Sequence, residues 1–153
     1  MIGRENLHDL YPLAPMQEGM LFHWLLSPQS EAYREQIAYR LRGTLDVACF
    51  EACWNQLARR HAILRTVFVH EKVARPLQMV LKKVTVPFHA EDLRRLAPEA
   101  QVERVSEYRR EARGRGFDLA RELPYRVAVL QLEDERFEVV WTFHHIILDG
   151  WSV

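Results

Sequence analysis

The stretch FHHIILDGWSV, residues 143–153, gathers the side chains that are best suited to chemistry. Two adjacent histidines, His144 and His145, follow a run of β-branched and aromatic residues. Side chains alternate along a strand, so the two imidazoles would point to opposite faces and could not both reach one metal ion. His145 closes the apolar face, where partial burial would lower its imidazole pKa and keep the ring neutral. His145 is therefore a candidate general base.

A histidine at the end of an apolar strand is also, and more often, an ordinary core residue. The residues that follow favour a catalytic role for His145 instead. Asp149 lies four residues beyond His145, and Gly150 allows a ligand to approach the backbone closely. An acyl-transfer site can be formed by a base, a sharp turn, an acid and a glycine of this kind. The sequence does not indicate a serine triad, because it has no Gly-x-Ser-x-Gly elbow and Ser152 lies outside any such turn.

Three helices and five strands are predicted to position these residues. Apolar residues at helical intervals predict three helices. One runs from Pro15 to Leu26, one begins after a cap at Asp46, and one runs from Pro98 to Gly114. Alternation and β-branched composition predict strands at residues 36–41, 64–71, 77–84, 125–132 and 136–145. The order of these elements predicts an α/β (α+β) two-layer sandwich.

Composition excludes several classes of protein. Of the 153 residues, 48% are hydrophobic, and 21 basic residues balance 21 acidic ones. This balance predicts a soluble globular domain and provides no overall field for nucleic acid or an anionic membrane. The first residues lack the features of a signal peptide, and no apolar stretch approaches the roughly 20 residues of a membrane span. A cytoplasmic location is expected.

Cys49 and Cys53 lie four residues apart, which places them on one face of the second helix. The sequence has no second Cys or His pair at metal-ligand spacing, so we interpret both as small packing residues that bind no metal and form no disulfide.

Four segments, in order, resemble the motifs of condensation domains of nonribosomal peptide synthetases, which belong to the chloramphenicol-acetyltransferase-like superfamily. HHIILDGWS resembles the HHxxxDG signature of these domains. LYPLAPMQEGMLFH, residues 10–23, resembles their opening motif, and GFDLARELPYRV, residues 116–127, resembles a segment that precedes the signature strand. RRHAILRTVF, residues 59–68, resembles the RHExLRTxF motif, with Ala62 in place of the common Glu.

The resemblance implies amide formation between two thioesters. The amine of an acceptor aminoacyl thioester attacks a donor peptidyl thioester, and each is carried on the 4'-phosphopantetheine arm of a carrier protein. His145 would orient or deprotonate the amine, and Gly150 would offer a backbone N–H to the oxyanion. His144, Asp149 and Arg65 would be structural, with Asp149 paired to an arginine of a second lobe. No cofactor or metal bound by the domain itself is implied.

The resemblance also implies that residues 1–153 are the N-terminal lobe of a two-lobed domain, with the active site in a tunnel between the lobes. The expected partners are donor and acceptor carrier proteins, adjacent synthetase domains and the second lobe, and the lobe alone is expected to be nearly inert. Two alternatives remain open. One is a coenzyme A-dependent acyltransferase of the same superfamily, and the other is a non-catalytic platform that docks carrier proteins.

Overall fold

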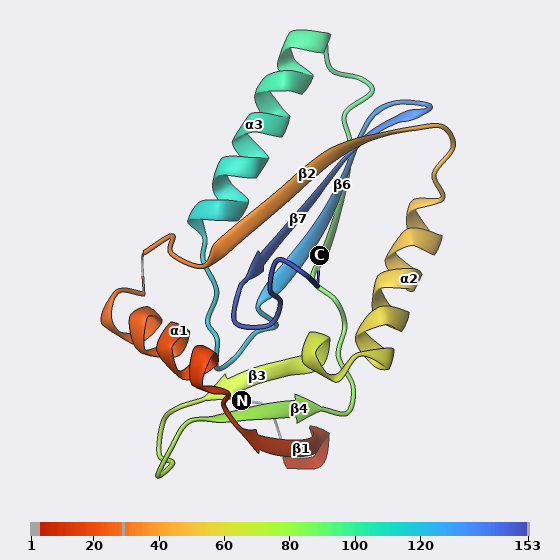
Figure 1. Cartoon of the computed structure of the whole chain (residues 1–153). Coiled ribbons are helices and arrows are strands. Elements are labelled where there is room, and N and C mark those ends of the chain that lie inside the picture. Colours follow the sequence, from red (N-terminus) through yellow and green to blue (C-terminus); the bar gives the residue numbers. More distant parts are fainter. Residues whose placement is uncertain (1–3, 29, 153) are drawn as a thin grey trace.

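The computed structural model describes residues 4–28 and 30–152, and these form two β-sheets and three α-helices (Figure 1). The smaller sheet has the order β1 (Leu7–Pro12), β4 (Leu77–Leu81), β3 (Thr66–Val69). The larger has the order β2 (Arg34–Arg42), β7 (Arg136–His144), β6 (Tyr125–Glu133), β5 (Phe88–Asp92). The helices are α1 (Pro15–Leu26), α2 (Val47–Arg60) and α3 (Pro98–Gly114), and short 3-10 helices span η1 (Arg4–Asn6) and η2 (Ala62–Arg65).

The three predicted helices are confirmed, and their first residues explain why they begin where they do. Pro15 and Pro98 occupy the first turns of α1 and α3, where a missing backbone N–H costs nothing. The side chain of Asp46 caps α2, because its carboxylate accepts a hydrogen bond from the backbone N–H of Cys49 at 2.9 Å.

The predicted strands are also present, although Leu64 and Arg65 belong to η2 and β4 ends at Leu81, and two further strands lie at sheet edges. β3 pairs with β4, and β7 lies between β2 and β6, all antiparallel. The additional strands are β1, which is mostly exposed, and β5, which runs parallel to β6 and connects to it through α3. Neither shows a clear apolar alternation, because each lies at the edge of its sheet and faces water over much of its length.

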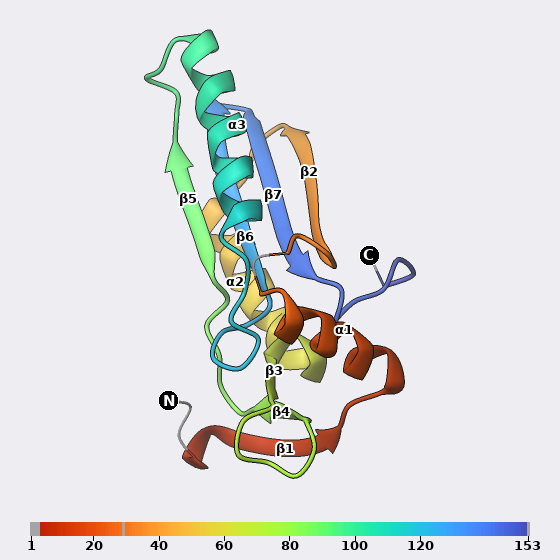
Figure 2. The same cartoon turned by 90° about the vertical axis from the view of Figure 1, so that its left-hand side faces the viewer.

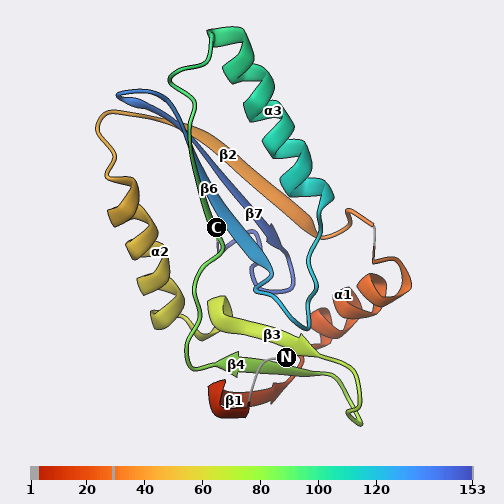
Figure 3. The same cartoon turned by 180° about the vertical axis from the view of Figure 1, so that it is seen from behind.

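The α/β fold class is confirmed, and the larger sheet carries one helix on each face (Figures 2 and 3). α2 packs on the face formed by Val129, Phe137 and Val139, whereas Val105 of α3 packs against Leu130 on the other face. The two-layer arrangement expected from the sequence is thus refined to helix, sheet and helix around this sheet. The smaller sheet lies beyond one end of these layers, below them in Figure 1.

The packing role predicted for the cysteines is wrong. Cys49 and Cys53 are both exposed on α2, although they do lie on one face of the helix and interact with each other. The apolar stripe of α2 turns its aromatic residues Phe50 and Trp54 towards the sheet, and the two cysteines fall outside this stripe. A spacing of four residues fixes a shared face but does not determine which face is buried.

Candidate active site

Hydrogen bonds join the segment that contains the two histidines to the segment around α1. The Gln17 side-chain amide donates from Nε2 to the backbone carbonyl of Ile146 at 3.1 Å, and its Oε1 accepts from the Ala14 N–H at 2.9 Å. Trp24, further along α1, donates from its indole Nε1 to the carbonyl of Phe117 at 3.1 Å. Gln17 and Trp24 are therefore hydrogen-bonded to residues more than 90 positions away in the sequence.

The remaining two motif segments join the same network. The buried Tyr125 hydroxyl donates to the Leu64 carbonyl at 2.9 Å, and the Phe68 N–H donates to the Leu119 carbonyl at 2.7 Å. Burial raises the pKa of Tyr125 well above its ordinary value, so the hydroxyl keeps its proton for this bond. All four motif segments thus meet around the end of β7.

His144 is the last residue of β7 and is almost fully buried, with 2% of its surface exposed. Its Nδ1 accepts a hydrogen bond from the Ile146 N–H at 3.1 Å, and its ring lies near that of Tyr33. Burial, with smaller contributions from Arg34 and His145, lowers the pKa of His144 from 6.5 to about 4. The stronger burial therefore falls on His144, whereas the alternation argument placed His145 on the buried face.

His145 begins the turn after β7 and is half-buried. Its Nδ1 lies 2.7 Å from the backbone carbonyl of Leu148, and its backbone N–H donates to the Tyr33 carbonyl, also at 2.7 Å. Because a carbonyl can only accept, Nδ1 must carry a proton, and in the neutral ring Nε2 is then the acceptor. The turn thus fixes the tautomer that a general base requires.

Glu35 is a candidate site residue that sequence reasoning missed. Its Oε1 lies 3.8 Å from His145 Nε2, and about half of its side chain is exposed. A carboxylate at this distance would interact favourably with an imidazolium formed when Nε2 takes up a proton. Glu35 pairs with Phe143 across the β2–β7 ladder, a register that sequence periodicity alone does not specify.

Asp149 and Gly150 lie in the exposed turn that follows. The Asp149 carboxylate accepts hydrogen bonds from the Ser152 hydroxyl at 2.6 Å and from the N–H groups of Trp151 and Ser152, and these bonds lower its pKa. The structure therefore shows Asp149 exposed and organising its own turn. A Cβ at Gly150 would meet no atom within 4 Å, so the described chain itself does not require glycine there.

Arg65 lies away from this turn, at the end of η2. Its side chain is half-buried, and Nη1 donates to the backbone carbonyl of Leu81 in β4. This contact joins η2 to the smaller sheet.

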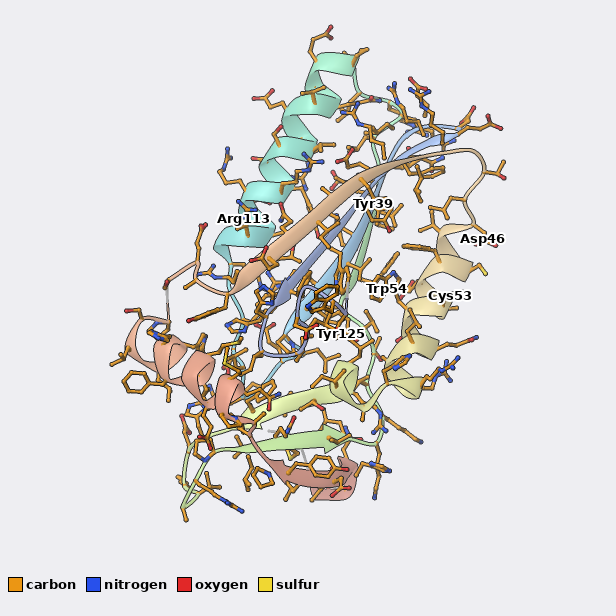
Figure 4. All side chains as sticks on the ribbon, in the orientation of Figure 1. Tyr39, Asp46, Cys53, Trp54, Arg113 and Tyr125 are labelled. Carbon is orange, nitrogen blue, oxygen red and sulfur yellow. The ribbon has the colours of Figure 1, made fainter. Side chains whose placement is uncertain are left out.

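A cavity of about 460 Å³ adjoins the turn, between α2, η2 and the end of β7. Its apolar walls come from two tryptophans and from aliphatic residues, and its polar side chains from one histidine and one serine: Trp54, Trp141, Leu57, Ile63, Leu64, Leu148, His61 and Ser152. The Trp54 ring lies 5.3 Å from that of Trp141, and Figure 4 shows Trp54 directed from α2 towards the sheet.

The described residues contain neither a metal cluster nor a membrane-spanning helix. Within residues 4–28 and 30–152, no group of three or more His, Cys, Asp or Glu side chains is arranged to hold a metal ion. In the same part of the chain, no helix has the length and apolar character needed to cross a membrane.

Comparison with known proteins identifies the family of this fold and motif set. The family model for the condensation domain matches residues 7–153. Surfactin synthase subunit 3 of Bacillus subtilis is 45% identical over 149 residues, which are 97% of this chain and 12% of that protein. Tyrocidine synthase 2 of Brevibacillus parabrevis is 38% identical over 151 residues, which are 99% of this chain and 4% of that protein.

Solved structures share the same fold at lower identity. The starter condensation domain of rhizomide synthetase aligns with a TM-score of 0.82 at 20% identity, over 94% of this chain and 34% of that one. The first condensation domain of the calcium-dependent antibiotic synthetase, solved with a substrate analogue, gives a TM-score of 0.78 at 20% identity, over 95% of this chain and 36% of that one. This chain therefore has the chloramphenicol-acetyltransferase-like fold and belongs to the condensation domain family of the nonribosomal peptide synthetases.

Proposed function

We propose that this chain supplies the histidine-bearing part of an active site that forms amide bonds between two carrier-bound thioesters. The single observation that carries the proposal is the contact between His145 Nδ1 and the Leu148 carbonyl. This contact leaves Nε2 as the proton acceptor on the half-buried ring of His145. His145 stands at the position of the second histidine in the HHxxxDG signature. Family membership supports the same reaction class, because condensation domains are in general acyl-transferring enzymes.

The proposed reaction is a nucleophilic substitution at a thioester. The acceptor amine attacks the donor carbonyl carbon, a C–N bond forms, and the amine proton passes to His145 Nε2. The C–S bond then breaks, and the departing thiolate takes up the proton from His145 Nε2, which restores the neutral ring. Glu35 would stabilise the transient imidazolium, and the backbone N–H of Gly150 would donate to the oxyanion. The free space around Gly150 is compatible with a substrate beside the backbone.

The remaining roles follow from the same assignment. His144 would hold the end of β7 and Arg65 would join η2 to β4, whereas Asp149 would shape the turn and face an arginine of a second lobe. Residues 1–153 would be the N-terminal lobe of the domain, since they cover about a third of the solved condensation domains. The substrates would arrive on phosphopantetheine arms of donor and acceptor carrier proteins, with adjacent synthetase domains and the second lobe as further partners.

The test uses the full-length protein that contains this chain, with loaded donor and acceptor carrier proteins. We expect His145→Ala to reduce dipeptidyl thioester formation by about 10²- to 10⁴-fold, the usual cost of removing a positioned general base. His89→Ala is the matched control, because His89 is exposed on β5. Condensation at the wild-type rate by His145→Ala would contradict the assigned role.

The same assay separates the alternatives. Acyl transfer from coenzyme A without any need for carrier proteins would support the coenzyme A-dependent acyltransferase. Carrier binding with no product in the wild-type protein would support a docking platform.

A further inference from the structure

Tyr33 lies immediately before β2 and has a main-chain conformation that is rare for an aromatic residue. Its φ angle is 63°, which is in the left-handed region. It is the third residue of a four-residue turn, in which the Glu31 carbonyl accepts a hydrogen bond from the Arg34 N–H at 3.1 Å. Glycine and asparagine usually occupy a third turn position with positive φ. For other residues, the crowding of Cβ against the following carbonyl disfavours this conformation roughly 5- to 30-fold.

Contacts on both sides of Tyr33 hold it in this conformation. Its ring lies near two imidazole rings, with centroid distances of 5.9 Å to His23 of α1 and 6.2 Å to His144. The guanidinium of Arg34, the next residue, donates to the Arg113 carbonyl in the last turn of α3 at 2.7 Å. A disfavoured main-chain conformation persists only where surrounding contacts fix it, and residues of this kind are concentrated at active sites.

The segment that begins at Tyr33 brings two groups to His145. The Tyr33 carbonyl accepts from the His145 N–H at 2.7 Å, which continues the β2–β7 ladder one residue beyond the pair of Arg34 and His144. Two residues further along, Glu35 places its carboxylate 3.8 Å from His145 Nε2. Because both groups come from one short segment, a change in the main chain at residue 33 would displace both contacts of His145.

Lys72 provides an internal comparison. Within residues 4–28 and 30–152, it is the other residue besides Tyr33 that has a side chain and a positive φ, of 57°. Lys72 is exposed in the connection between β3 and β4 of the smaller sheet. At Lys72 the left-handed conformation shapes a surface turn, whereas at Tyr33 it coincides with a hydrogen bond to His145.

We propose that Tyr33 is a positioning residue for His145: its left-handed main chain brings its carbonyl to the His145 N–H, and its ring stabilises that conformation by packing near His23 and His144. This inference rests on the proposed function, in which His145 accepts the amine proton. Tyr33 acts through other groups, because it holds the imidazole and the Glu35 carboxylate in the relative positions that proton transfer requires.

The first experiment compares three substitutions at position 33 in the full-length protein, with loaded carrier proteins. Tyr33→Phe keeps the ring, Tyr33→Gly removes the ring but favours the left-handed main chain, and Tyr33→Ala removes the ring and disfavours that main chain. We expect kcat to stay within about twofold of the wild-type value for Tyr33→Phe and within about threefold for Tyr33→Gly, and to fall about fivefold or more for Tyr33→Ala. The KM for the carrier-bound substrates should change by less than about twofold in all three variants, because Tyr33 acts on the base and not on substrate binding.

Lys72→Gly and Lys72→Ala are the matched control pair, because they make the same change of main-chain preference at a surface turn, and both should keep the wild-type kcat. A loss in Lys72→Ala equal to that in Tyr33→Ala would overturn the specific role of Tyr33. Equal losses in Tyr33→Gly and Tyr33→Ala would overturn the inference, because the main chain would then not be what positions His145. Wild-type kcat in Tyr33→Ala would overturn it as well.

Tyr33→Leu replaces Tyr33→Ala if the alanine variant does not fold. Leucine restores apolar bulk in place of the ring but still disfavours the left-handed conformation. The same loss of kcat relative to Tyr33→Gly is therefore expected, and equal kcat values for the leucine and glycine variants would overturn the inference.

A hydrogen-exchange measurement keeps this inference separable from the proposed function. The exchange rate of the His145 amide, resolved by mass spectrometry of overlapping peptides from the full-length protein, reports its bond to the Tyr33 carbonyl without any reaction. We expect Tyr33→Ala to accelerate this exchange about fivefold or more, and Tyr33→Phe, Tyr33→Gly and Lys72→Ala to change it by less than about threefold. If the wild-type protein forms no amide but the variants show this pattern, the proposed function fails and the role of Tyr33 in holding His145 stands. Amide formation by the wild-type protein, together with one His145 exchange rate in all variants, would remove the Tyr33 assignment alone.

Discussion

His144 and His145 occupy adjacent positions but meet opposite physical demands. His144 lies among buried groups, and its Nδ1 accepts from a backbone N–H, which requires a neutral ring. His145 is partly exposed, and its Nδ1 donates to a backbone carbonyl. One ring therefore stabilises the end of β7, while the other presents Nε2 as an acceptor. The division arises because the strand ends between them and the chain turns.

The lowered pKa of His144 predicts a pH-dependent stability. Between the ordinary value of 6.5 and the folded value of about 4, the unfolded chain binds a proton that the folded chain does not. The free energy of unfolding should therefore fall as pH falls through this window, by up to about 3 kcal/mol from this residue. Urea unfolding of the complete domain at pH 7 and pH 4.5 measures the change.

His144→Asn removes the titrating group while keeping an acceptor, so it should be less stable at pH 7 but lose less stability on acidification. His61→Asn is the control, because His61 is exposed at the end of α2. If the free energy of unfolding of His144→Asn depended on pH as steeply as that of the wild-type protein, a group other than His144 would be responsible for the pH dependence.

Sequence reasoning at this scale predicted that the chain turns after the two histidines, but it did not predict the contacts of that turn. Strand alternation correctly placed the two rings in different surroundings, since the His145 ring lies edge-on to Phe143 and the His144 ring lies near Tyr33. It could not reveal Glu35 or Gln17, because both act across pairings that are distant in sequence. The register of β2 on β7 and the packing of α1 determine those contacts.

At the scale of elements, helices were predictable where capping and periodicity coincide. Asp46 before a strong apolar stripe, and Pro15 and Pro98 in first turns, indicated the starts of α2, α1 and α3. The edge strands β1 and β5 were missed because their stability comes from backbone pairing with neighbours, not from an apolar face. On α3, Val102 is 61% exposed whereas Val105, three residues further on, is buried, so helical spacing of apolar residues does not by itself determine which of them are buried.

Between α3 and the larger sheet, a fully buried carboxylate connects three elements. Glu138 of β7 pairs with Arg40 of β2 at 3.1 Å and with Arg109 of α3. Removing one partner from a buried ion pair leaves charge poorly compensated and typically costs about 3 to 5 kcal/mol. Because Arg40 remains and the Arg109 side chain is 40% exposed, we expect Arg109→Ala to destabilise the domain by about 1 to 3 kcal/mol in urea unfolding, less than the full cost of leaving a buried charge unpaired.

Arg110→Ala provides the comparison, because Arg110 neighbours Arg109 on α3 but is exposed. It should change the free energy of unfolding by less than about 0.5 kcal/mol. Equal effects of the two substitutions would show that the ion pair contributes no more than helix propensity.

The exposed cysteines of α2 lead to a reactivity prediction. The neighbouring Cys53 is the main cause of the raised pKa of Cys49, which reduces the reactive thiolate fraction near neutral pH. We expect iodoacetamide to label both thiols in the native protein, and Cys53→Ala to speed the labelling of Cys49 about two- to fivefold at pH 7.5. Mass spectrometry of timed samples measures both rates. Resistance of native Cys49 to alkylation until denaturant is added would contradict its exposure.

On the scale of the whole molecule, the turn after β7 lies where buried and exposed regions meet. Ile146 and Ile147 are buried in the main core, while Trp151 is 98% exposed. Weak hydrogen-exchange protection is expected over residues 149–152, because the N–H groups of Trp151 and Ser152 bond to Asp149 within an exposed turn, whereas Ile146 and Ile147 are buried. Val153 lies outside the described residues.

Hydrogen exchange tests this boundary. Amides of residues 150–152 should exchange much faster than those of residues 145–147 in a protein limited to residues 1–153. Their protection should rise in the full-length protein, where a second lobe would cover Trp151. Strong protection of residues 150–152 in a monomer of the shorter protein would contradict this, and a dimer would have to be excluded by light scattering.

The anchors of the histidine turn are largely main-chain atoms: the carbonyls of Ile146 and Leu148 and the N–H of His145. Main-chain anchors persist when a side chain is exchanged for another of compatible size. Leu148 can therefore be randomised in a library while Gln17 and the imidazole keep their bonding partners. A substitution at position 148 therefore changes the side chain beside the turn without removing the main-chain contacts that hold the His145 ring.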